Sequence, residues 1–264
     1  MKAIILAAGM GTRLGKYAKN LPKGMLRFFG KTLIERQIEV LRKCGINDIV
    51  IVKGYMSDKI NFGGIKYYTN NNFANTNMVE TLFRAEQEMD TDFLVLYSDI
   101  IYEKKVLLEV LKSRVDIGVT ADIDYKDYWK ARLDNPKIDT ESFKLGEGGE
   151  IVDIGNPNCS FSDVEARYVG IIKVSKKGAE IFKKNYKLNR DKYYNSDLFW
   201  MRSKNFKNAY MTCFLKAIVD SGFKVYPIFI KRGWLEFDTV EDYEKSTMWV
   251  KNGSVVRFID LTDL

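Results

Sequence analysis

The chain has 264 residues, of which 46% are hydrophobic and 29% are charged, so it is long enough to bury the core of one large domain. It carries a net charge of +7 and no histidine, which excludes a Ser-His-Asp hydrolase, a His-ligated zinc enzyme and a histidine general base. No apolar run reaches the roughly 18 residues of a membrane span, so we expect no membrane partner.

The first half of the chain alternates strand-like and helix-like runs. The strand-like runs are strongly apolar or rich in β-formers, and they cover residues 2–8, 48–55, 65–70, 92–100 and 116–123. The helix-like runs cover residues 32–45, 78–89 and 104–113. This alternation predicts an α/β fold with a doubly wound, Rossmann-like and mostly parallel sheet flanked by helices.

The second half is less regular. Its start, residues 125–175, is polar and turn-rich and then strand-like. We expect further strands at residues 143–155, 166–175, 223–230 and 234–238, an edge strand at 255–261, and helices at 178–186, 209–222 and 240–250. No linker or repeat interrupts the chain, so we expect a single domain over 1–264 with two halves, 1–124 and 125–264.

The stretch LAAGMGTRLG, residues 6–15, follows the first strand, at the edge where open α/β sheets bind ligands. It lacks the third glycine of a dinucleotide fingerprint and the Gly-Lys-Ser/Thr ending of a Walker loop. Gly9 and Gly11 allow positive φ and close approach, so backbone amides can point at a phosphate. Arg13 adds a bidentate donor, and Lys23 follows behind a stiffening proline.

Two aspartates close strongly apolar runs: Asp99 ends LVLYSD and Asp238 ends WLEFD. Each one alone is as readily a turn starter or a helix N-cap. Together, in a chain with a phosphate-binding loop, they suggest a Mg²⁺ site, because Mg²⁺ takes one or two carboxylates plus phosphate oxygens.

The run LAAGMGTRL, followed by LPK and GKTLIERQIEVL, resembles the nucleotidyltransferase family that makes sugar nucleotides and activated phospho-alcohols. A tight strand–helix turn with a surface lysine is the alternative reading of these residues. The resemblance implies a glycosyltransferase-A-like nucleotidyltransferase fold with an acceptor-binding insertion. It also implies that Asp99 and Asp238 share the Mg²⁺ ion, although the family often has glycine where Ser98 stands here.

The same resemblance implies the nucleotide site. Arg13 and Lys23 would be the catalytic residues and would grip the triphosphate, while an acceptor phosphate attacks the α-phosphorus and pyrophosphate leaves. Catalysis would then be positioning plus charge neutralisation, without a general base. Asn75 to Asn77 would read the base or ribose, or would form only a polar helix N-terminus. The expected nucleotide-binding residues are Leu6, Ala7, Ala8, Gly9, Gly11, Thr12, Arg13, Lys23, Asn75, Thr76, Asn77 and Ser98.

Segments spread over nearly the whole chain resemble one branch of this family, the phosphocholine cytidylyltransferase type, and most of all its phosphoglutamine cytidylyltransferase relatives of capsular phosphoramidate biosynthesis. These segments are NNFANTNMVETLFRA, YWKARLDNP, EARYVGIIKVS, NAYMTCFL and GWLEFDTVEDYE. The branch implies CTP as the nucleotide, and phosphocholine, phosphoglutamine or a phosphonate as the acceptor.

The acceptor pocket is expected in the second half of the chain. Aromatic faces beside carboxylates can hold an amine or quaternary ammonium, and an arginine can contact a phosphate or carboxylate. The alternative is that the aromatics are core residues and the acids are solvated. The candidate residues are Trp129, Arg132, Glu165, Tyr168, Trp234 and Glu236.

Three other functions stay open on the sequence: a sugar-1-phosphate nucleotidyltransferase using UTP or dTTP, a non-catalytic nucleotide-binding regulator, and a basic nucleic-acid-binding protein. The lysines are scattered, so we expect no nucleic-acid partner. The three cysteines are far apart, which favours a reducing, cytoplasmic location. The expected partners are CTP and a small phosphorylated acceptor, and a homodimer is left open.

Overall fold

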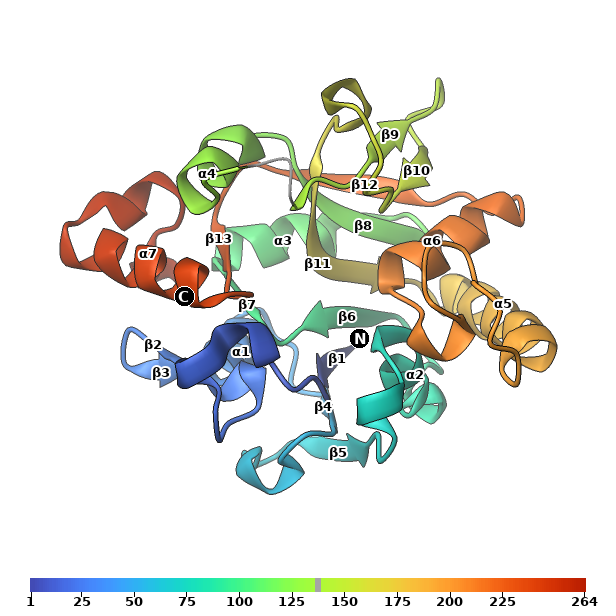
Figure 1. The fold of residues 1–264 in the computed structure, drawn as a ribbon, viewed down its shortest axis with the longest axis horizontal. Helices are drawn as coiled ribbons and strands as arrows, with labels where there is room; N and C mark the ends of the chain where they lie inside the picture. Colours follow the sequence, from blue (N-terminus) through green and yellow to red (C-terminus); the bar gives the residue numbers. More distant parts are fainter. Residues whose placement is uncertain (136–138) are drawn as a thin grey trace.

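The computed structural model describes residues 1–135 and 139–264, and its centre is a seven-stranded sheet (Figure 1). The strands of this sheet are β1 (Lys2–Ala7), β4 (Ile49–Lys53), β5 (Lys66–Thr69), β6 (Phe93–Tyr97), β8 (Ile117–Asp122), β11 (Arg167–Val174) and β12 (Tyr226–Ile230). Their order is β12-β8-β11-β6-β1-β4-β5. Only the β11 pairings, with β6 and β8, are antiparallel, so the predicted mostly parallel sheet is confirmed.

Three two-stranded ribbons accompany this sheet. Their strands are β2 (Arg27–Phe28) with β3 (Lys31–Thr32), β7 (Ile100–Tyr102) with β13 (Trp234–Glu236), and β9 (Phe143–Leu145) with β10 (Ile151–Ile154). The β7–β13 ribbon places Glu236 opposite Ile100, and the Phe237 N–H donates to the Asp99 carbonyl at 2.9 Å. The ends of the runs LVLYSD and WLEFD, far apart in the sequence, therefore lie together.

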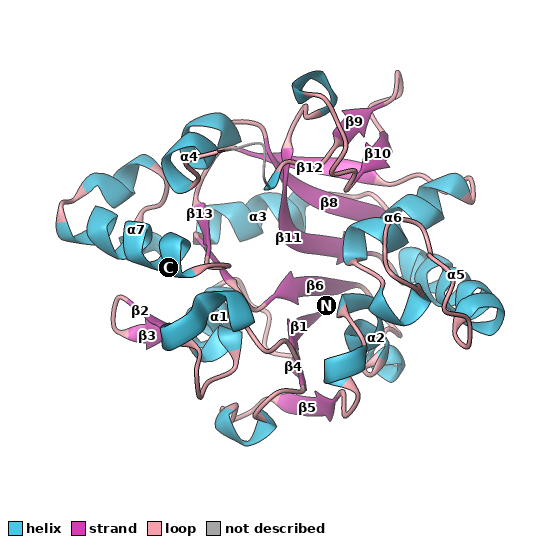
Figure 2. Ribbon diagram, viewed as in Figure 1, coloured by secondary structure: helices cyan, strands magenta, loops and turns pink. Residues whose placement is uncertain are grey.

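Helices cover both faces of the sheet (Figure 2). They are α1 (Leu33–Lys43), α2 (Met78–Phe83), α3 (Lys104–Lys112), α4 (Tyr125–Arg132), α5 (Lys176–Tyr193), α6 (Met211–Asp220) and α7 (Val240–Lys251). β1 contributes to two core layers: Ala3 and Ile5 belong to the cluster that contains residues of α1, α3, α4 and α7, whereas Ile4 and Leu6 belong to the cluster that contains residues of α2, α5 and α6. Because both faces are buried, β1 reads as a continuous apolar run.

Some predicted elements were wrong or misplaced. Residues 255–261 do not form an edge strand; they lie in 3-10 turns at Ser254–Arg257 and Leu261–Asp263. Val255, Phe258 and Ile259 are buried at helical rather than alternating spacing, which explains the difference. α5 is longer than predicted, α4 occupies a segment read as turns, and the predicted helix at 78–89 shortens to α2 followed by a 3-10 turn.

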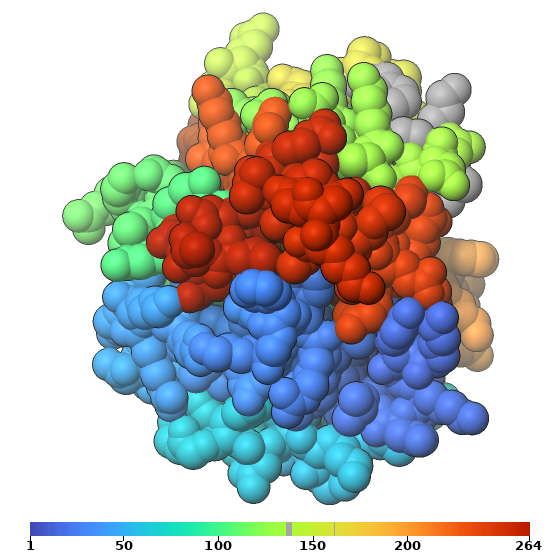
Figure 3. All heavy atoms as spheres, turned by 90° about the vertical axis from the view of Figure 1, so that its left-hand side faces the viewer, coloured from blue at the N-terminus to red at the C-terminus, as the bar shows by residue number. Residues whose placement is uncertain are grey.

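The C-terminal part packs directly on the N-terminal part, as the red and blue atoms in Figure 3 show. The rings of Tyr17 and Tyr243 lie 4.3 Å apart, and Lys16 pairs with Glu244 at 2.9 Å. α7 therefore packs against the segment that follows β1. Within the described residues, no helix is both long and apolar enough to cross a membrane.

Candidate active site

One edge of the sheet gathers the residues that the sequence singled out. β1 and β6 are parallel, with Leu6 beside Tyr97, so the loop after β1 and the Ser98-Asp99 turn leave the sheet together. β11 runs the other way and starts at this edge with Arg167 and Tyr168. Two adjoining cavities open along this edge.

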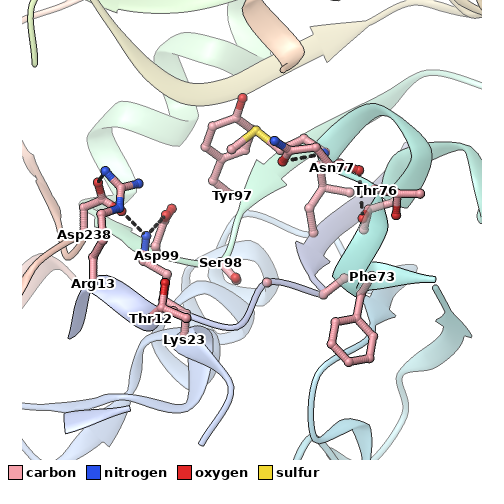
Figure 4. A pocket seen from close by; sticks show the side chains of 16 residues that line it. Thr12, Arg13, Lys23, Phe73, Thr76, Asn77, Tyr97, Ser98, Asp99 and Asp238 are labelled. Carbon is pink, nitrogen blue, oxygen red and sulfur yellow. Dashed lines mark hydrogen bonds and ion pairs between the residues drawn. The ribbon is translucent and has the colours of Figure 1, made fainter. Parts of the chain in front are cut away.

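The first cavity, of about 220 Å³, lies against the loop after β1 (Figure 4). Its lining combines that loop, the start of α2, the end of β6 and the end of the β13 segment. The lining residues are Leu6, Ala8, Gly9, Gly11, Thr12, Arg13, Lys23, Phe73, Thr76, Asn77, Met78, Thr81, Tyr97, Ser98, Asp99 and Asp238. We call it the nucleotide cavity.

Two glycines let Lys23 reach this cavity. Gly11 has φ +64°, and a Cβ built on it would lie 3.1 Å from the Lys23 Cβ, so the loop folds closely over the lysine. A Cβ on Gly24 would lie 2.6 Å from the Ile34 side chain and 2.9 Å from the Ser98 Cβ. The Lys23 segment can therefore lie against the end of β6. Gly9 has no positive φ and faces open space.

Four charged side chains form the end of the nucleotide cavity drawn at the left of Figure 4. The Lys23 ammonium lies 2.6 Å from Asp99 and 2.5 Å from Asp238, and Arg13 lies 2.6 Å from the other Asp238 oxygen. Burial alone would lower the pKa of Lys23, but Asp99 and Asp238 raise it above its ordinary value. Lys23 is therefore a fixed positive charge at neutral pH.

The two aspartates fit a hard divalent cation. Asp99 Oδ1 is buried and has no hydrogen-bond partner, so one carboxylate oxygen is already free of protein donors. Two carboxylates match the small protein contribution that Mg²⁺ usually takes beside phosphate oxygens and water. Among the described residues no cluster of three or more acidic, cysteine or histidine ligands exists, so an all-protein metal cage is absent from that part of the chain.

The opposite end of the nucleotide cavity is polar and aromatic. Thr76 and Asn77 line it at the start of α2, and Phe73 lies beside them (Figure 4). Asn77 is also the N-cap of α2, with its side chain accepting from the Met78 N–H at 2.9 Å. Asn77 can therefore both cap α2 and line the cavity. A charged end and a neutral end suit a triphosphate and a nucleoside respectively.

The second cavity, of about 480 Å³, adjoins the first and shares its charged end with it. We call it the acceptor cavity. Its lining residues are Arg13, Lys23, Met78, Tyr97, Asp99, Ile100, Asp139, Glu141, Arg167, Tyr168, Val169, Gly170, Tyr210, Thr212, Trp234, Glu236 and Asp238. Lys23 and both aspartates thus stand where a molecule in one cavity meets a molecule in the other.

Tyr168, Trp234 and Glu236 line the acceptor cavity, and their binding of an acceptor stays a prediction. The Trp234 indole N–H donates to Asp122 at 2.9 Å, which fixes the ring in the wall. Burial raises the pKa of Glu236 to about 7, although Arg132 pulls it down.

Arg132 lies behind the cavity wall. Its buried guanidinium donates to both oxygens of Asp242 at 2.7 and 3.0 Å and to Glu236 at 2.6 Å. Asp242 in turn accepts the backbone N–H groups of Asp238 and Thr239 at 2.9 and 2.8 Å. This chain of contacts sets the position of Asp238, so Arg132 acts as a positioning residue in this geometry.

The other predicted site residues lie outside the two cavities. Trp129 is buried behind Arg167, with the guanidinium 3.9 Å from its ring centroid. Glu165 is exposed and accepts the Leu145 N–H at 2.8 Å. In the nucleotide half, Ala7 is buried in the sheet and Asn75 is exposed and bonded to Asn72. Pro136, the last residue of the segment YWKARLDNP, lies outside the described residues.

Sequence reasoning missed several lining residues of the acceptor cavity. Arg167 and Glu141 are the charged ones with the most direct bearing on a ligand. No sequence signal pointed to Arg167, because the first position of a strand reaches the ligand edge only when that strand is antiparallel, as β11 is. Glu141 lies in an irregular segment and left no signal either.

Comparison with known proteins agrees with this geometry. Residues 3–126 match the family described as the MobA-like NTP transferase domain. The chain is 32% identical to the CTP:phosphoglutamine cytidylyltransferase of Campylobacter jejuni over 256 residues, covering 92% of this chain and 98% of that protein. It is 33% identical to the choline-phosphate cytidylyltransferase of Streptococcus pneumoniae over 43% of this chain and 51% of that one.

Solved structures show the same fold. CTP:phosphocholine cytidylyltransferase from Streptococcus pneumoniae aligns with a TM-score of 0.65 at 24% identity, over 94% of this chain and 98% of that chain. A putative glucose-1-phosphate thymidylyltransferase from Bacillus anthracis aligns with a TM-score of 0.71 at 17% identity, over 96% of both chains. The expected glycosyltransferase-A-like nucleotidyltransferase fold is confirmed.

Proposed function

The chain belongs to the nucleotidyltransferase family that includes the CTP:phosphoglutamine cytidylyltransferase, and from this membership we propose that it transfers CMP from CTP to a small phosphorylated acceptor with release of pyrophosphate. The observation that carries the proposal is the junction of the two cavities. Lys23, Arg13, Asp99 and Asp238 stand there together, and each of them lines both cavities.

The chemistry at this junction is an in-line displacement. An oxygen of the acceptor phosphate or phosphonate forms a bond to the α-phosphorus of CTP, and the bond from that phosphorus to the bridging oxygen breaks. The electron pair of the broken bond leaves with pyrophosphate. Arg13 and Lys23 neutralise the charge that develops on the phosphate oxygens. A phosphate monoester is already a nucleophile at neutral pH, so a chain without histidine needs no general base here.

We also propose that Asp99 and Asp238 hold Mg²⁺ with the nucleotide. Bound there, the ion would neutralise triphosphate charge and help to orient the α-phosphate. Asp238→Asn should lower the rate, and excess Mg²⁺ should partly restore it, because a weaker ligand set raises the metal concentration needed. A rate that stays low at every Mg²⁺ concentration would contradict the metal role of Asp238.

The nucleoside end of CTP would lie along the backbone of Leu6 to Gly11 and beside Thr76 and Asn77. The acceptor would lie against Tyr168, Trp234 and Glu236. The two halves, 1–124 and 125–264, would then divide the two substrates within one nucleotidyltransferase domain. The cytoplasm, where free thiols such as the three cysteines persist, is the proposed location.

Pyrophosphate release with Mg²⁺ tests the proposal. The assay crosses CTP, UTP, dTTP, ATP and GTP with phosphocholine, phosphoglutamine, aminoalkyl phosphonates, glycerol phosphate and hexose-1-phosphates. We expect turnover with CTP and a non-sugar acceptor. Turnover confined to UTP or dTTP with a sugar phosphate would overturn the cytidylyl assignment while keeping the reaction type. Tight nucleotide binding without pyrophosphate from any pair would favour a regulator instead.

A further inference from the structure

Helix α5 carries most of the chain's excess positive charge. Its 18 residues include seven basic and two acidic side chains, a net +5 out of the chain's +7. Its inner face is buried against α6, where the rings of Phe182 and Phe214 lie 5.3 Å apart. Six of the seven basic residues are exposed. The outer face of α5 is therefore basic, and it lies at the end of the molecule opposite α7 (Figure 1).

Most of these positive charges have no acidic partner. In the described part of the chain, the only ion pairs from α5 lysines join Lys177 to Asp116 at 2.8 Å and Lys183 to Glu180 at 3.9 Å. A set of unpaired charges of one sign on one face creates a field that attracts an anionic surface. The basic residues of α5 without an ion pair are Lys176, Lys184, Lys187, Arg190 and Lys192.

The loop after α5 adds exposed apolar side chains at the same end of the molecule. Leu188 on α5 is 60% exposed, and Leu198 and Phe199 on the loop are 70% and 83% exposed. The Trp200 indole donates to the Asn189 side chain at 3.1 Å, so the loop returns beside the residue that follows Leu188. One exposed leucine is ordinary, but three large apolar side chains beside a basic helix indicate an interaction site.

The fold supports the loop on which Leu198 and Phe199 stand. Trp200 is buried, with its ring 4.9 Å from that of Phe206. Arg202 donates to the Ile154 carbonyl and to Asp153, each at 2.7 Å. Leu198 and Phe199 directly precede these anchors, so they are held out toward solvent by a structured loop.

The combination of charge and apolar side chains favours one kind of partner. In a two-fold dimer, a second copy would place the same basic face against itself, and the like charges would repel. A nucleic acid would pair with the basic side chains but would leave the aliphatic Leu188 and Leu198 unused. A bilayer with anionic headgroups offers phosphates to the basic side chains and an apolar layer below them to the leucines and Phe199.

We propose that the face formed by α5 and residues 195–200 binds the surface of membranes that contain anionic phospholipids. The expectation of no membrane partner rested on the lack of a membrane span, which binding at the surface does not need. This inference goes beyond the proposed cytidylyl transfer and does not depend on it.

Cosedimentation with vesicles tests the proposal. The full chain is mixed with vesicles of phosphatidylglycerol and phosphatidylcholine in equal parts, or with vesicles of phosphatidylcholine alone. We expect at least roughly tenfold stronger partitioning to the anionic vesicles, because several basic side chains act together. Added salt should weaken this binding, since it screens the charges. No binding to the anionic vesicles, or equal binding to both kinds, would overturn the proposal.

Two matched pairs of variants test the residues. Lys187→Gln should weaken binding to anionic vesicles roughly fivefold, whereas Lys251→Gln, which removes an exposed lysine from α7, should not change it. Phe199→Ser should weaken the binding roughly tenfold, whereas Val256→Ser, at a side chain that is 73% exposed elsewhere, should not. Equal losses within either pair would mean that no defined face binds, and would overturn the proposal.

Two soluble polyanions distinguish a membrane from other anionic partners. Polyuridylate stands for a single-stranded nucleic acid and polyglutamate for an acidic protein. If either one binds more tightly than the anionic vesicles and loses affinity in Lys187→Gln, the face belongs to that class of partner and the membrane proposal is wrong. Vesicle binding is measured without CTP or acceptor, so its failure leaves the proposed transfer intact, and failure of the transfer leaves the vesicle result intact.

Discussion

The two cavities of the active site are built in different ways. The nucleotide cavity is lined mainly by short continuous segments, residues 6–13, 73–81 and 97–99, and the first of these contributes chiefly backbone and small side chains. The acceptor cavity draws its own residues from scattered positions in the 139–141, 167–170, 210–212 and 234–236 segments, and chiefly through large side chains.

The difference teaches where specificity lies. Backbone amides in a glycine loop bind phosphate in the same way whatever the rest of the molecule is. Side chains collected from many segments can change one at a time, so the acceptor can differ between relatives that share the loop. The predictions below ask how far the two cavities are separate.

The largest effect should come from Arg132, which joins the acceptor wall to the aspartate of the nucleotide cavity. Arg132→Met would leave Asp242 and Glu236 buried without their cation, and should lower the free energy of unfolding by about 3–5 kcal/mol. Urea denaturation measures this. The double variant Arg132→Met/Asp242→Asn should lose less unfolding free energy than the sum of the two single variants, because it no longer leaves a buried Asp242 charge unpaired. Losses that simply add would contradict the coupling between Arg132 and Asp242.

Lys23→Ala should lower kcat on the order of a hundredfold or more with every acceptor, because Lys23 stabilises charge at the phosphates that all acceptors share. Steady-state pyrophosphate release checks this. Lys16→Ala is the matched control: Lys16 belongs to the same loop but pairs with Glu244 at the surface. A loss with only some acceptors would show that Lys23 belongs to the acceptor cavity alone.

Two glutamates, Glu88 in the first half and Glu141 in the second, should respond to acid in opposite ways. Burial alone would raise the pKa of Glu88, but donors from Lys66, Tyr68 and Lys2 lower it to about 2. Its stabilisation is present above its ordinary value near 4.5 and is lost as pH falls toward 2. Glu88→Gln should cost about 1–2 kcal/mol at neutral pH and flatten that acid limb. The pKa of Glu141 is raised, so its burial costs stability at neutral pH and that cost is relieved as pH falls; Glu141→Gln should remove this relief and raise the unfolding free energy at neutral pH.

The smallest effect should be that of Glu165→Gln. Glu165 was expected at the acceptor, but its side chain is exposed and its carboxylate accepts the Leu145 N–H. The unfolding free energy should change by less than about 0.5 kcal/mol and the acceptor KM should stay the same. A several-fold rise in KM for one acceptor would mean that the acceptor cavity extends to the β9–β10 ribbon.

The sequence predicted more of the nucleotide cavity than of the acceptor cavity. Gly11, Arg13 and Asp99 could be placed together because loops and strand ends at the carboxyl edge of a parallel sheet meet in space by rule. Lys23 and Asp238 were expected beside them from the family resemblance, since neither ends a strand of that sheet. Nothing comparable relates the irregular segment around Glu141 to the start of β11. Arg132 and Trp129 are residue types that often bind ligands, but here Arg132 pairs with Asp242 and the Trp129 ring packs against Arg167. These partners come from tertiary packing, which the sequence pattern does not show.

The double pairing of Lys23 has one more consequence. The Lys23 ammonium pairs with the two carboxylates that a divalent cation would use, so an ion must compete with a cation that is covalently part of the chain. A triphosphate that draws Lys23 toward its own oxygens releases both carboxylates. If the bound triphosphate raises the affinity for the ion by some factor, the bound ion must raise the affinity for the triphosphate by the same factor. The metal and the nucleotide should therefore load cooperatively.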